Sequence, residues 1–195
     1  MSRFLKYPLL LALPFALAAC GQTSVECSNP EVAKVLGNNI IQNIDTHMSL
    51  VSLLGGVEPK SGELESMLAE FKPTLVAVAT TQKDETINKR SCQAMMTFEF
   101  PETVYEKAMS GVKHTNLINF DIQLGIVPDL VAAAKNLGVE LTRTSISSPI
   151  TYTIQTSDDG RNFYTEGQTS GELGLMILRF VGAALAEQQA MKKVN

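Results

Sequence analysis

The chain contains no tryptophan, and aromatic residues make up only 6% of its 195 residues. It therefore lacks the aromatic platform on which sugar rings or nucleic-acid bases usually stack. Its two histidines, His47 and His114, lie far apart and belong to no metal-binding or catalytic-triad motif. The GxSxG, HExxH, phosphate-loop and dinucleotide-binding signatures are also missing. We therefore expect no enzymatic activity, no metal and no cofactor.

Basic residues are fewer than acidic residues in this chain. Lys and Arg number 16 against 20 Asp and Glu, which gives a formal net charge of −4 at pH 7. A nucleic-acid partner is not expected, because such proteins carry a basic surface for the phosphate backbone. Glu63 with Glu65, or Glu99 with Glu102, could meet distant acids in a hydrolase cleft. Solvated surface positions explain these scattered carboxylates more simply.

Two segments are strongly apolar, but neither reaches the roughly 20 residues that a membrane-spanning helix requires. The first, Leu9–Leu17, follows the basic residues Arg3 and Lys6. The second, Leu173–Ala186, is interrupted by Arg179 and is predicted to be a helix. Packing inside the domain explains this helix more simply than a contact with a second protein or a bilayer.

The first apolar segment leads to Leu17-Ala18-Ala19-Cys20. A basic start, an apolar middle and small residues before a thiol resemble the signal peptide and lipobox of bacterial lipoproteins. The resemblance implies that residues 1–19 are removed and that Cys20 becomes the first residue. Its sulfur would carry a diacylglycerol and its nitrogen a further acyl group, so that the chain is attached to a membrane through covalent lipid.

The residue after Cys20 is Gly21. In the lipoprotein family, Asp at this place favours retention in the inner membrane, so Gly21 implies an outer-membrane anchor facing the periplasm. An inner-membrane or cell-surface anchor stays open. Two other interpretations of the leader also remain: an ordinary secretory peptide with a chance cysteine, and an uncleaved helix, which Pro8 and Pro14 oppose.

The other two of the three cysteines form an even pair once Cys20 is acylated. In an oxidising compartment a disulfide between Cys27 and Cys92 is the natural expectation. It would tie the N-terminal segment to a central strand and stabilise the fold by about 4 kcal/mol through loop closure. A redox or metal pair is the weaker alternative, because there is no CxxC spacing. Residues 20–28 then form the lipidated cysteine and a short tether.

The first part of the domain alternates between helical and strand-like patterns. Asn29-Pro30-Glu31 starts a helix over residues 30–46, and a second helix is predicted from Ser61 until Pro73. Two strands, residues 74–81 and 92–100, follow and are joined by the polar stretch 82–90. The side chains predicted to face inward are Val32, Val35, Leu36, Ile40, Ile44, Leu64, Met67, Leu68, Phe71, Cys92, Ala94, Met96, Phe98 and Phe100.

Residues 101–148 are interpreted as a helical insertion over the sheet edge. A short helix is expected over 103–109 and another over 128–137, the latter ended by Gly138. Its inward face is predicted to hold Leu130, Val131, Ala134 and Leu137. A hairpin of strands 150–156 and 161–165 follows, and its Asp158-Asp159-Gly160 is typical of a tight turn and not of a calcium loop.

Together these elements predict one globular α+β domain over residues 29–195, with a mostly antiparallel sheet of about four strands and helices packed on it. A cystatin-like helix-on-sheet arrangement is one architectural analogy. The leading functional hypothesis is a non-enzymatic, lipid-anchored envelope protein that binds another protein or supports an assembly. An inhibitor or immunity protein against a toxin or wall-degrading enzyme, and an envelope hydrolase, are the alternatives.

Overall fold

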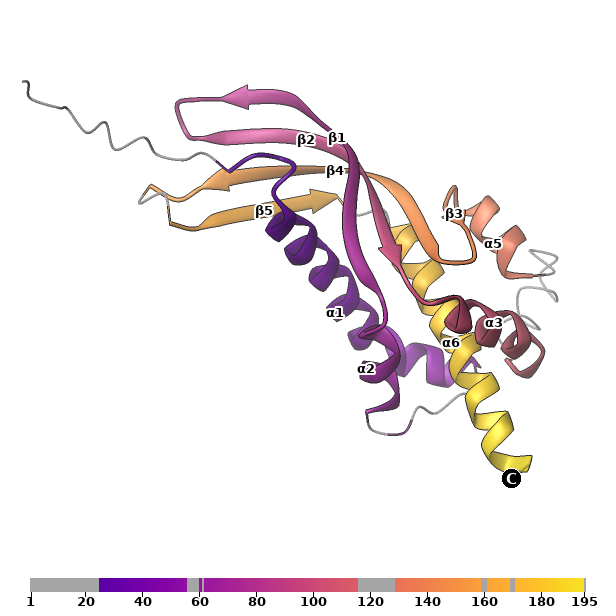
Figure 1. The fold of residues 1–195 in the computed structure, drawn as a ribbon. Coiled ribbons are helices and arrows are strands. Elements are labelled where there is room, and N and C mark those ends of the chain that lie inside the picture. The colour runs from indigo at the N-terminus through magenta and orange to yellow at the C-terminus, as the bar shows by residue number, and fades with distance from the viewer. Residues whose placement is uncertain are drawn as a thin grey trace, which may run out of the picture.

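The computed structural model describes residues 25–55, 60, 62–115, 129–158, 161–168 and 171–194, with only the backbone described for 45–55, 168 and 194. The predicted leader, residues 1–19, and Cys20 lie outside the described residues. Within them the chain is α+β, with five α-helices and an antiparallel sheet of five strands on which helices pack (Figure 1). The predicted fold class is confirmed.

The strands of the sheet are β1 (Lys72–Asp84), β2 (Lys89–Glu99), β3 (Glu140–Leu141), β4 (Ser145–Thr156) and β5 (Phe163–Gln168). The two long strands β2 and β4 form its centre. The strand order is β1-β2-β4-β3, and β5 also pairs with β4. Strand β4 therefore has two partners besides β2. Strand β3 pairs with its first residues, at Ile146 and Ser147, whereas β5 pairs with Thr151–Thr156.

The alternation predicted for β2 is confirmed. Cys92, Ala94, Met96 and Phe98 are buried, and so is Phe100 just beyond the strand. Their register partners on β4 continue the same buried face, because cross-strand neighbours share one side of a sheet. These pairs are Cys92 with Tyr152, Ala94 with Ile150, Met96 with Ser148 and Phe98 with Ile146.

Strand β1 begins earlier than its sequence indicates. The predicted helix from Ser61 to Pro73 is only α2 (Glu63–Leu68), and Pro73 lies inside the strand. Proline is tolerated there because β1 is an edge strand, whose outer N–H groups need no partner in the sheet. The predicted 82–90 connection is shorter too: the strands continue to Asp84 and from Lys89, which leaves a turn over 85–88.

The longest helices cover one side of the sheet, as Figure 1 shows. Helix α1 (Pro30–Gly55) begins as predicted, with the Asn29 side chain accepting a hydrogen bond from the Glu31 N–H at 2.9 Å. It continues beyond the predicted residue 46 to Gly55. Val35 does not face inward but is 39% exposed. Helix α6 (Gly171–Val194) likewise extends past the predicted 173–186 by further polar turns.

Within the described residues, the segment between β2 and β4 is helical in part. It holds α3 (Glu102–Gly111), the short 3-10 helix η1 (Val112–His114), α5 (Leu130–Asn136) and β3, and β4 already begins at Ser145. Val131 was assigned to the inward face of α5 but is 48% exposed, whereas Ala133 is buried. Because α5 has only seven residues, the rest of the fold covers little of its surface. Gly138 has a φ of 66° and ends the helix as predicted.

Aromatic side chains join the helical end of the molecule to the sheet. The Phe100 ring lies between Phe71 and Phe180, with ring centroids 5.2 and 5.0 Å away. Phe180 comes from α6, Phe100 follows β2 and Phe71 precedes β1. This cluster fixes α6 at the end of the sheet where α2 and α3 also pack.

Candidate binding groove and N-terminal clamp

The first described residues are fastened to the sheet at several points, and we name residues 25–27 the N-terminal clamp. Cys27 forms a disulfide with Cys92 of β2, with their Cα atoms 6.0 Å apart. The Tyr152 hydroxyl of β4 donates a hydrogen bond of 2.7 Å to the Cys27 carbonyl oxygen. Burial raises the pKa of Tyr152 to about 12, so the phenol remains a donor at neutral pH.

Two further contacts extend the clamp. The Val25 N–H donates to the Thr156 hydroxyl at 3.4 Å, and the Arg90 guanidinium donates to the Glu26 carboxylate at 2.5 Å. The clamp therefore reaches both central strands. The disulfide expected from the sequence is present, and Cys92 faces inward as predicted.

The clamp lies beside the turns of the two hairpins. The Thr156 N–H at the end of β4 donates to the Asn88 carbonyl in the β1–β2 turn at 3.2 Å. In Figure 1 the indigo start of the described chain lies near these turns, and the C-terminal end of α6 lies at the opposite end of the molecule. The N-terminal attachment and the helical end are thus on opposite sides of the fold.

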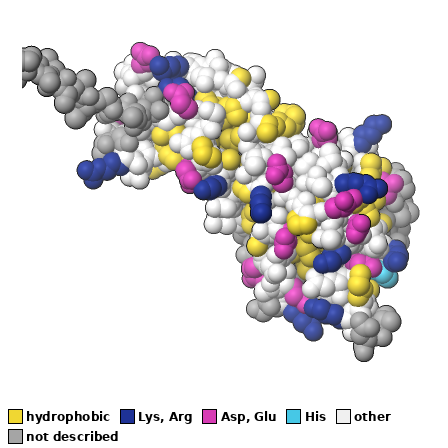
Figure 2. Space-filling model, in the orientation of Figure 1, with side chains coloured by type: hydrophobic (Ala, Val, Ile, Leu, Met, Phe, Trp, Pro, Cys, Tyr) yellow, Lys and Arg dark blue, Asp and Glu magenta, His cyan; other side chains and the backbone are white. Residues whose placement is uncertain are grey.

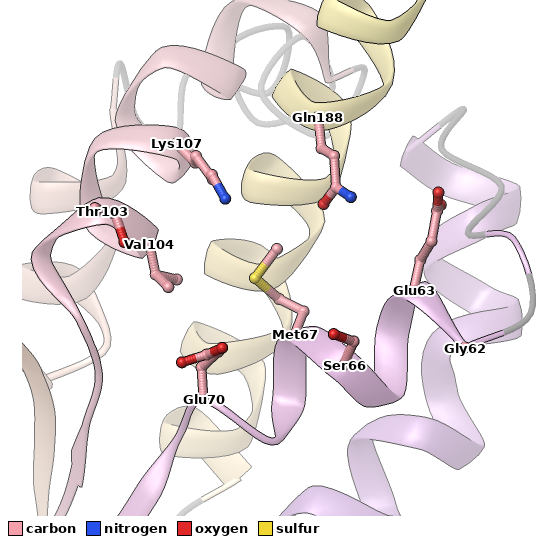
Figure 3. Close-up of a pocket in the computed structure, with 9 residues that line it drawn as sticks. All are labelled: Gly62, Glu63, Ser66, Met67, Glu70, Thr103, Val104, Lys107 and Gln188. Carbon is pink, nitrogen blue, oxygen red and sulfur yellow. The ribbon is translucent and has the colours of Figure 1, made fainter.

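A groove of about 470 Å³ opens at this helical end, between α2, α3 and α6, and we name it the helical groove. Figure 3 shows the Met67 side chain lying between the elements that form its walls. The residues that line it are Gly62, Glu63, Ser66, Met67, Glu70, Thr103, Val104, Lys107 and Gln188. Six of these nine residues are polar, and they bring both signs of charge to one depression.

Charge on one wall of the helical groove is neutralised within the fold. Lys192 of α6 donates to the Glu63 carboxylate at 2.7 Å, and the Lys60 N–H donates to the same carboxylate at 3.1 Å. The hydrogen bond from Lys192, followed by that from the Lys60 backbone, lowers the pKa of Glu63. Among the described residues, Glu70 and Lys107 form no ion pair, so their charges remain available to an incoming polar group.

A second groove of about 370 Å³ shares Glu70 with the first. It lies at the end of β1 and β2 and is bordered by Lys72, Glu99 and Ser145, among others. The exposed carboxylate of Glu70 thus belongs to a surface that continues from the helices onto the sheet. Figure 2 shows acidic and basic side chains interspersed over one face of the molecule, without a field of one sign.

The carboxylates considered for hydrolysis are not gathered in one cleft. Glu63 lines the helical groove and Glu99 the second groove, while Glu65 is exposed outside both. Glu102 is held by Arg143 at 2.7 Å, and this hydrogen bond raises the pKa of the guanidinium. Therefore neither Glu63 with Glu65 nor Glu99 with Glu102 lines one groove together.

The structure describes the side chain of only one of the two histidines. The His114 Nε2 atom lies 3.4 Å from the Glu187 carboxylate of α6, and the side chain of His47 lies outside the described residues. Asp158 is exposed in the β4–β5 turn, and its neighbour Asp159 is not described. The described part of the chain contains no group of three or more His, Cys, Asp or Glu side chains that could hold a metal.

The helical groove was not found by sequence reasoning. Its polar residues come from separate elements: Glu70 follows α2, Lys107 lies in α3 and Gln188 in α6. None stands in a motif with another, and only the packing of α3 against α6 brings them together. The polar turns that extend α6 beyond residue 186 were the one available signal, because they place Gln188 and Lys192 on a helix.

Among the described helices, none is long and apolar enough to cross a membrane. Comparison of the chain with models of protein families, with curated proteins and with solved structures finds no match.

Proposed function

We propose that this chain is a lipid-anchored bacterial cell-envelope protein, attached through Cys20 to the outer membrane, whose domain binds a protein partner without acting as an enzyme. The sequence Leu17-Ala18-Ala19-Cys20 carries the proposal. Three acyl chains on one residue make the attachment effectively permanent, because each buried methylene contributes about 0.8 kcal/mol.

The N-terminal clamp supports this proposal. A disulfide is typical of proteins that fold outside the cytoplasm. Cys27 lies seven positions after Cys20 and is bonded to a central strand. A force on the lipid is transmitted through this bond to the sheet. The anchored N-terminal segment therefore cannot separate from the domain.

The helical groove supports a binding function. Its walls belong to three elements, and it presents the exposed Glu70 and Lys107 around the less polar Met67. A polar segment of a partner protein that carries both charge signs fits this chemistry. An apolar small molecule does not, because polar groups line much of the surface.

Site-specific photo-crosslinking in intact cells tests the binding proposal. A photoreactive residue replaces Lys107 in the groove or, as a matched control, Val131 on the exposed side of α5. We expect a discrete protein adduct from position 107 that is absent from position 131. Identical adducts at both positions, or none at 107, would contradict the proposed groove.

The identity of the adduct also decides between the two binding hypotheses. Recovery of a single toxin or wall-degrading enzyme in stoichiometric amount would favour an inhibitor or immunity protein. Recovery of a structural envelope component would favour an assembly role.

A further inference from the structure

We infer that the domain stands on the membrane with its hairpin turns against the lipid headgroups and its helical groove turned away from the bilayer. The interaction surface is the tip of the β1–β2 hairpin, residues 84–89, and its partner is a phospholipid surface. This inference rests on the proposed lipid anchor at Cys20.

The length of the tether limits where the domain can lie. Five peptide units separate Cys20 from Val25, and a fully extended chain spans at most about 3.6 Å per residue, or roughly 18 Å in total. Val25 is bonded to Thr156 at the end of β4, and Cys27 is bonded to β2. The ends of both hairpins are therefore held within a short distance of the bilayer surface.

The tip itself suits a lipid–water interface. Ile87 is 47% exposed at the turn, where an apolar side chain gains by leaving water. Six nearby charged residues form three ion pairs: Lys83 with Glu85 at 2.8 Å, Lys89 with Glu166 at 3.9 Å, and Arg90 with Glu26. The carboxylate of Asp84 accepts a hydrogen bond of 2.9 Å from the Thr86 N–H instead. Paired charges of both signs lessen the repulsion from anionic lipid and do not depend on attraction to it.

The helical groove lies at the other end of the same strands. Strand β2 runs from Lys89 to Glu99, so its ends are about 33 Å apart at roughly 3.3 Å per residue. Glu99 borders the second groove, which shares Glu70 with the helical groove. A partner therefore reaches the grooves from the side away from the membrane, beyond the reach of the headgroups.

The absence of tryptophan from the chain makes this orientation measurable. Ile87→Trp places a single tryptophan at the hairpin tip, and Met191→Trp places one near the end of α6, where Met191 is 50% exposed. The lipidated full-length proteins are reconstituted into vesicles of phosphatidylcholine and phosphatidylglycerol, with or without bromine on the acyl chains. Bromine quenches only tryptophans that lie close to the bilayer.

We expect the emission of Ile87→Trp to lie at shorter wavelength on vesicles than in solution and to be quenched by brominated lipid, while Met191→Trp is unaffected. A Ser/Gly linker of twenty residues inserted after Gly21 should weaken the quenching of Ile87→Trp, because the tip is then free to leave the surface. Urea unfolding of each variant confirms that the fold is retained.

The outcomes separate the orientation from the anchor. Protein that fails to float with the vesicles contradicts the anchor and the orientation together. Protein that floats, but in which Ile87→Trp is unquenched or Met191→Trp is quenched equally, overturns the orientation alone. Undiminished quenching with the long linker would support the orientation and overturn only the role given to the short tether, since the tip would then be held at the lipid by its own contacts.

Discussion

At the scale of single residues, Tyr152 joins the N-terminal segment to the sheet through a hydrogen bond that only its protonated hydroxyl can donate. Its register partner is Cys92, whose disulfide holds the same segment. One residue pair on neighbouring strands thus fixes Cys27 twice, once covalently and once through its carbonyl oxygen.

This arrangement predicts a loss of stability in strong alkali. Below pH 10 the phenol is protonated in both the folded and the unfolded chain. Between its ordinary pKa of 10.0 and the raised value of about 12, the unfolded chain loses the proton and the folded chain keeps it. Ionisation therefore favours unfolding, and the free energy of unfolding falls as the pH rises through this range.

Tyr152→Phe tests this effect. At pH 7 the variant should be less stable by about 1–2 kcal/mol, because the Cys27 carbonyl loses its donor. The difference in free energy of unfolding between wild type and variant, measured by urea denaturation, should shrink as the pH rises from 10 to 12. A difference that stays constant over this range would show that Tyr152 ionises as easily in the fold as in the unfolded chain.

At the scale of elements, the close contact of α3 with α6 builds the helical groove. A Cβ atom added to Gly111 would lie 1.8 Å from the Ala183 carbonyl oxygen and 2.7 Å from the carbonyl carbon. Both atoms belong to helix backbone, which cannot move aside as a flexible side chain can. Glycine at this position allows the two helices to approach one another.

Gly111→Ala should therefore destabilise the domain, by about 3 kcal/mol if the helices separate to relieve the overlap. Gly171→Ala, at the start of α6, is the matched control, because no atom lies within 4 Å of the added Cβ. Its stability should stay within about 0.5 kcal/mol of the wild type. Thermal and urea unfolding of both variants measures this difference, and equal stabilities would contradict the proposed close packing.

The accuracy of the sequence-based predictions also differs from element to element. The buried face of β2 could be predicted residue by residue, because alternation between a buried and an exposed face leaves a periodic pattern. Pro73 was misplaced because proline ends a helix but is also tolerated in an edge strand, and sequence alone does not show which strand is at the edge. Val131 was misplaced because the two turns of α5, with apolar residues on both sides, do not show which side is covered.

At the scale of the whole molecule, the chain connects a predicted lipid anchor to a groove at the far end of the fold. The disulfide pair was predictable, since excluding Cys20 leaves Cys27 and Cys92 as partners. The helical groove was not predictable, because it depends on how α2, α3 and α6 pack. The proposed function depends on both ends: the first determines where the protein is held, and the second what it can bind.

Mass spectrometry of the N-terminal peptide, from protein purified out of bacterial membranes after expression with its own leader, tests the central claim most directly. The account predicts that the chain begins at Cys20 and carries the added mass of a diacylglycerol and an amide-linked acyl group. An unmodified N-terminus, or one that begins at any other residue, would contradict the lipid anchor and the membrane orientation inferred from it.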